Sequence, residues 1–70
     1  MIQHSLAEEI RQRRNILGIS QEQLVDMAEV GLRTLKSIEM GNGNPTTATI
    51  SKLAEVLGME LKLELKKPGL

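Results

Sequence analysis

The chain has 70 residues, and its nine Lys or Arg are balanced by nine Asp or Glu, so its net charge is zero. It has no cysteine, which excludes a disulfide framework, and its single histidine leaves too few ligands for a zinc finger. It has no aromatic residue, which argues against nucleic-acid modules that stack bases on aromatic side chains. We expect one cytoplasmic domain over residues 1–70, with no metal, no cofactor, no signal sequence and no membrane span.

Four helices are predicted within a helical core of residues 5–58, because apolar residues recur there at helical spacing between capping and breaking residues. The residues expected to bound these helices are Ser5 and Gly18, Ser20 and Ala28, Leu32 and Gly41, and Thr46 and Gly58. The apolar residues expected to face the core are Leu6, Ile10, Leu17, Leu24, Ala28, Val30, Leu35, Ile38, Ile50, Leu53, Ala54 and Leu57.

Residues 59–66 alternate strictly between apolar and charged side chains, which is typical of a strand with one buried face. No second strand is visible in the sequence, so we predict that this one pairs with a second copy in a homodimer, leaving residues 67–70 as a tail. An antiparallel register centred on Leu63 sets unlike charges opposite each other, whereas centring on Lys62 opposes like charges and centring on Leu61 forms fewer pairs. An amphipathic C-terminal helix is the alternative, since Leu, Lys and Glu are good helix formers. The residues assigned to dimerisation are Glu60, Leu61, Lys62, Leu63, Glu64, Leu65 and Lys66.

Residues 21–40 have the pattern of a helix, a short turn and a second helix, which is the helix-turn-helix arrangement. The runs Ser20–Leu24 and Thr34–Gly41, the step Asn44-Pro45 and the run Leu53–Gly58 resemble the Cro/CI-type, or XRE-type, helix-turn-helix family over about residues 6–61. The alternating C-terminal segment further resembles HipB-like regulators.

The resemblance implies a mainly α, four-helix, lambda-repressor-like fold. It also implies a sequence-specific transcriptional regulator, a dimeric repressor that binds double-stranded DNA at an inverted-repeat operator. The HipB-like likeness implies an antitoxin-like role with a toxin kinase (HipA-like) as partner.

The family pattern assigns roles to individual residues of this chain. Base contacts are expected from the outer face of the second helix of the motif, where Arg or Lys can donate to guanine and Leu can touch a thymine methyl. These candidates are Leu32, Arg33, Lys36 and Ser37. The expected phosphate contacts are Gln21, Asn42 and Asn44, and the expected structural salt bridge joins Arg14 to Glu39.

Three positions depart from the family pattern: Glu29 replaces a turn glycine, Val25 replaces an alanine, and Gly31 replaces a small hydroxyl residue. A left-handed conformation at Glu29 would cost about 1–2 kcal/mol. Two other residues, Arg11 and Arg13, either reach phosphate or form a solvated face.

We predict no enzymatic activity, because the sequence has no glycine-rich phosphate loop after a strand, no cysteine, and no catalytic partner near His4. The alternative function is an XRE-fold interaction module that binds another regulator rather than DNA. Zero net charge favours this alternative, and the cations on the outer helix face disfavour it.

Overall fold

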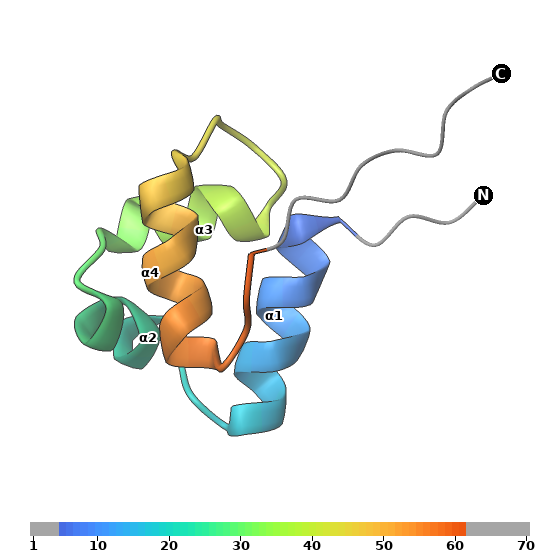
Figure 1. The fold of residues 1–70 in the computed structure, drawn as a ribbon, viewed down its shortest axis with the longest axis vertical. Coiled ribbons are helices and arrows are strands. Elements are labelled where there is room, and N and C mark those ends of the chain that lie inside the picture. Colours follow the sequence, from blue (N-terminus) through green and yellow to red (C-terminus); the bar gives the residue numbers. More distant parts are fainter. Residues whose placement is uncertain (1–4, 62–70) are drawn as a thin grey trace, which may run out of the picture.

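The computed structural model describes residues 5–61 and has four helices and no strand within that range. The helices are α1 (Leu6–Leu17), α2 (Gln21–Ala28), α3 (Leu32–Glu39) and α4 (Thr47–Leu57). Both α1 and α2 pack against α3 and α4 (Figure 1). The predicted mainly α, four-helix fold is therefore confirmed. No helix in the described part of the chain has the length and apolar character needed to cross a membrane.

Side-chain caps explain where three of the four described helices begin. At α2, Ser20 Oγ accepts the backbone amide of Gln23 at 3.0 Å, and the Gln23 side chain accepts the Ser20 amide at 2.8 Å. Ser5 and Thr46 cap α1 and α4 in the same way, each accepting the amide three residues further on at 3.1 Å. Each such cap contributes about 1 kcal/mol by satisfying an amide that has no partner within the helix.

The core lies where the four helices meet. Leucines from three helices have no exposed surface, and each contributes about 1.5–3 kcal/mol through the apolar area that it removes from water. These residues are Leu24 on α2, Leu35 on α3, and Leu53 and Leu57 on α4. The buried residues around them are Ile10, Ala28, Ile38 and Ile50, and Val30 packs against the edge of this cluster.

Helix α1 contributes less apolar surface to the core than predicted. Leu6 is 38% exposed and Leu17 is 43% exposed, so their assignment to the core is wrong. Ala7 and Ile10 are the buried residues of α1, and Arg14 follows them on the same helix face. A polar side chain therefore occupies the inward position in the second half of α1.

Only the first residues of the predicted C-terminal strand are described. Gly58 ends α4 in a left-handed conformation, with φ 70°, and Met59 then packs against the core. Residues 59–61 are not part of a strand. The rest of the predicted strand, residues 62–66, and the tail to residue 70 lie outside the described residues. The strand, its register and the dimer consequently stay predictions.

Candidate nucleic-acid interface

Helix α3 is buried on one side and open on the other. Leu35, Ile38 and Glu39 face the interior. On the opposite side Arg33 and Lys36 are exposed. The remaining candidates for base contact, Leu32 and Ser37, are half-buried on the same outer face. The structure thus brings the four predicted base-contacting residues onto one face of α3.

Glu39 is held by side chains from two other helices. Arg14 Nε donates to Glu39 Oε2 at 2.9 Å, and Arg14 Nη2 donates to Glu39 Oε1 at 3.0 Å. Gln21 Nε2 also donates to Glu39 Oε1, at 3.1 Å. A further hydrogen bond joins Arg14 Nη1 to the carbonyl oxygen of Ile19 at 3.1 Å. This cluster links α1, the start of α2 and the end of α3.

Both charged side chains of the Arg14–Glu39 ion pair are largely removed from water, so each needs the other as its partner. Glu39 is only 4% exposed and the Arg14 side chain 15% exposed. The hydrogen bond to Glu39 raises the pKa of Arg14 above its ordinary value, although burial opposes the shift. Gln21, a predicted phosphate contact, uses one of its two amide hydrogens inside the protein, so one amide hydrogen remains for any other acceptor.

The other two arginines of α1 bind the C-terminal ends of helices. Arg11 Nη1 donates to the backbone carbonyl oxygen of Glu39, at the end of α3. Arg13 Nε donates to the carbonyl oxygen of Leu57, at the end of α4, at 2.7 Å. A cation at a helix C-terminus is favoured by the helix dipole, by about 0.3–1 kcal/mol. Both guanidinium groups therefore bind a carbonyl oxygen of the fold, and Arg11 is exposed while Arg13 is half-buried.

The loop between α3 and α4 carries the remaining residues of the candidate interface. Asn42 and Asn44, the predicted phosphate contacts, are both exposed there. A groove of about 270 Å³ lies between α3 and this loop, lined by Arg33 and Ser37 on the helix and by residues 42–45 on the loop. The structure therefore places two base-contact candidates beside two phosphate-contact candidates, whereas Gln21 lies with Glu39.

Sequence reasoning gave no DNA-facing role to Met40, the residue that caps α3. Met40 is 72% exposed. It lies four residues after Lys36 and seven after Arg33, so helical spacing places it on their side of α3. That spacing is the signal from which its place on the outer face could have been predicted.

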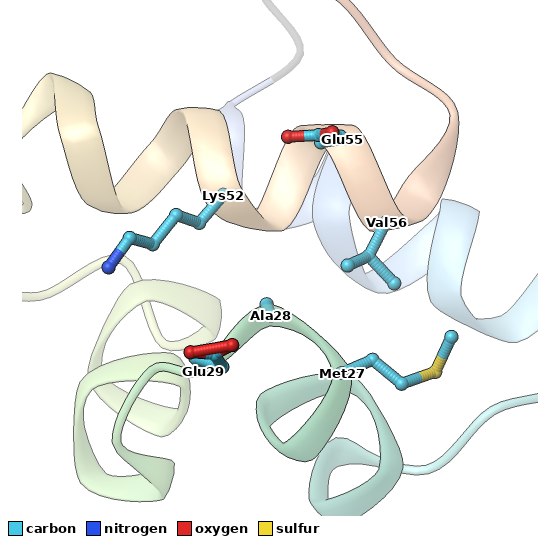
Figure 2. Close-up of a pocket in the computed structure, with 6 residues that line it drawn as sticks. All are labelled: Met27, Ala28, Glu29, Lys52, Glu55 and Val56. Carbon is cyan, nitrogen blue, oxygen red and sulfur yellow. The ribbon is translucent and has the colours of Figure 1, made fainter.

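The turn of the motif has the geometry expected at Glu29. This residue is left-handed, with φ 56° and ψ 47°, and its amide donates to the carbonyl of Val25. Its side chain lines a second groove, of about 310 Å³, between α2 and α4. Figure 2 shows Glu29 on the α2 wall and Lys52 on the α4 wall of this groove. None of its lining residues comes from α3.

Comparison with known proteins connects this geometry to a function. Residues 10–63 match the helix-turn-helix family. The chain is also 35% identical, over 69 residues, to "Control protein C.SmaI" of Serratia marcescens, in a match that covers 99% of this chain and 82% of that protein. The exposed outer face of α3, on a core that holds the helix in place, is the feature through which this motif enters DNA. The chain belongs to the XRE-type helix-turn-helix family of DNA-binding transcriptional regulators.

Proposed function

We propose that the protein is a dimeric repressor that binds an inverted-repeat operator by inserting α3 of each subunit into the major groove. The observation that carries this proposal is the outer face of α3, where Arg33 and Lys36 are exposed. The arginines of α1, by contrast, bind carbonyl and carboxylate oxygens within the fold. Specific contacts to DNA bases are therefore assigned to α3.

The side chains on the outer face of α3 and in the loop that follows it have separate roles in the proposal. Arg33 and Lys36 donate to guanine O6 and N7, and Leu32 contacts a thymine methyl. Asn42 and Asn44 donate to backbone phosphates beside the groove, where side-chain amides position a protein without reading sequence. Ser37 was expected to contact a base, but its hydroxyl hydrogen is donated to the carbonyl oxygen of Asn42 in the loop.

The dimer is part of the same proposal. Two copies of α3 related by a two-fold axis match the symmetry of an inverted repeat. The alternating segment 59–66 is the proposed contact between the copies, paired antiparallel about Leu63. Repression follows where the bound dimer occupies the site that the transcription machinery needs.

The HipB-like assignment, with a toxin kinase as partner, rests on that alternating segment alone. The protein named a control protein, which is similar over nearly the whole chain, supports a regulatory role and does not specify a kinase partner. Co-purification from the native cell tests the partner: a kinase recovered in a fixed ratio supports the antitoxin-like role, and recovery of the homodimer by itself opposes it.

The proposed function is tested by selecting bound fragments from random and genomic DNA. We expect an enriched inverted repeat, and we expect the double variant Arg33→Ala/Lys36→Ala to lose it while remaining folded and dimeric. Lys52→Ala is the matched control, because Lys52 is an exposed lysine on α4 that lines the groove away from α3. Unchanged DNA binding by the double variant would refute the assignment. No enrichment by the folded wild-type dimer would favour the module that binds another regulator.

A further inference from the structure

The chain leaves α3 through a tight hydrogen-bonded turn. The Gly41 amide donates to the carbonyl of Ile38, and the Asn42 amide donates to the carbonyl of Ser37, both at 2.9 Å. This pair of bonds is the Schellman arrangement, which satisfies carbonyls at a helix end. It fixes the backbone as far as the Asn42 amide and no further.

Beyond that point one side chain holds the loop to the helix. Ser37 Oγ donates to the carbonyl oxygen of Asn42 at 3.2 Å. In the described range 5–61, the chain from the Asn42 carbonyl to the cap at Thr46 makes no other hydrogen bond to α3. In the described range, the Ser37 hydroxyl therefore makes the side-chain hydrogen bond that joins this loop to α3.

Gly43 brings the backbone back against the same hydroxyl. It is left-handed, with φ 78°, and a Cβ atom built on it would lie 3.0 Å from Ser37 Oγ. Such a contact is too short for carbon and oxygen to keep without movement, and the left-handed φ disfavours any side chain. Ser37 and Gly43 thus fit together as a hydroxyl against a bare Cα, which we call the Ser37–Gly43 latch.

We propose that Ser37 is a positioning residue, which acts on DNA binding through the latch and not by reading a base. This inference rests on the proposed function. A serine hydroxyl has one hydrogen to donate, and here it is directed to Asn42. The latch fixes Asn42 and Asn44 beside the outer face of α3, so that the helix and the loop meet DNA as one surface and less ordering is needed on binding.

The test compares Ser37→Ala with Ser51→Ala, a matched removal of a hydroxyl from an exposed serine on α4. Losing one hydrogen bond is expected to weaken DNA binding about two- to tenfold. The loss is expected to be equal on the selected operator and on unrelated DNA, with the preferred base unchanged at every operator position. A changed preference at one position would show that Ser37 reads a base, and an unchanged affinity would show that the latch does not matter; either result overturns the inference.

Gly43→Ala supplies the second half of a double-variant cycle. Gly43→Ala is expected to weaken DNA binding more in the wild-type background than in the Ser37→Ala background, because Ser37→Ala removes the hydroxyl that the new Cβ meets. Strictly additive losses would contradict the contact between the two residues.

A third measurement does not depend on DNA. Backbone order parameters of the free protein are expected to fall at Gly43 and Asn44 in Ser37→Ala, while those in α2 stay unchanged. Unchanged values in the loop would overturn the latch itself. Failure of the proposed function has a different signature, since the wild type would then enrich no DNA although the loop still loosens in the variant.

Discussion

Replacing Arg14 with Met is expected to destabilise the domain strongly, because it leaves the Glu39 carboxylate buried with one neutral donor, Gln21. Removing one partner of a buried ion pair costs about 3–5 kcal/mol. The 15% exposure of the Arg14 side chain places this pair at the lower end of that range. For a domain of this size, a loss of about 3 kcal/mol lowers Tm by about 12–24 °C.

The complementary change, Glu39→Gln, is expected to cost less. It leaves a cation that is 15% exposed, whereas Arg14→Met leaves an anion that is 4% exposed. Thermal and urea unfolding followed by helical circular dichroism measure both variants. A double variant, Arg14→Met/Glu39→Met, is expected to be more stable than Arg14→Met alone, because no unpaired charge remains. The reasoning would be refuted by an Arg14→Met variant within about 1 kcal/mol of the wild type, the value of a surface pair.

The raised pKa of Arg14 fixes how this effect depends on pH. A group whose pKa is higher in the folded state stabilises the fold fully below its ordinary pKa and loses that stabilisation only as pH rises through the folded value. For an arginine that range is strongly alkaline. The stability difference between the wild type and Arg14→Met that arises from Arg14 titration is therefore expected to stay constant through the neutral and mildly alkaline range.

Three further predictions concern the turn, the start of α3 and the DNA face. Glu29→Gly removes a left-handed strain of about 1–2 kcal/mol, and it lowers stability by about 0.4–1 kcal/mol because glycine gives the unfolded chain more conformational entropy. The melting temperature is therefore expected to rise by a few degrees. Glu29→Ala, which keeps the strain, is expected not to raise it. Gly31→Ser adds a cap where α3 has no side-chain cap, and calorimetry is expected to show a gain of a few tenths of a kcal/mol; a loss would mean that the hydroxyl does not reach the helix amides. Fluorescence anisotropy across salt concentrations is expected to give a slope of log K against log salt no steeper than about −4, because Arg33 and Lys36 of two subunits are the cations placed at DNA and the phosphate contacts are assigned to the neutral Asn42 and Asn44. A slope near about −8 would require further cations at phosphates and would contradict that assignment.

The parts of the fold that sequence reasoning predicted correctly depend on neighbours only a few residues apart. The capping box of α2 needs Ser20 and Gln23, and both of its hydrogen bonds are present. The left-handed turn at Glu29 was expected from the motif and is observed. The inward face of α4 follows from apolar spacing within one helix. Such features are encoded locally, so the rest of the fold does not have to be known to predict them.

The errors concern features that distant parts of the chain decide. Periodicity placed Leu17 on the inward face of α1, but it gave no information on which neighbour would cover the last turn of that helix. The structure buries Ala7 and Ile10 and directs Arg14 to Glu39, which lies 25 residues further along the chain. A pattern of apolar residues cannot reveal that a charged side chain has a partner at that distance. The family resemblance supplied that pairing instead.

The arginines of α1 show why charge counted along a sequence misleads about a DNA-binding surface. Arg11, Arg13 and Arg14 fall within four residues and, as a sequence, resemble a basic patch. Each of them instead binds an oxygen at the end of α3 or α4. With that charge committed to the fold, we expect affinity to depend more on neutral donors held in fixed positions than on release of counterions. Neutral donors act in this way only where the loop that carries them is held in place, and that is the role that we propose for the Ser37–Gly43 latch.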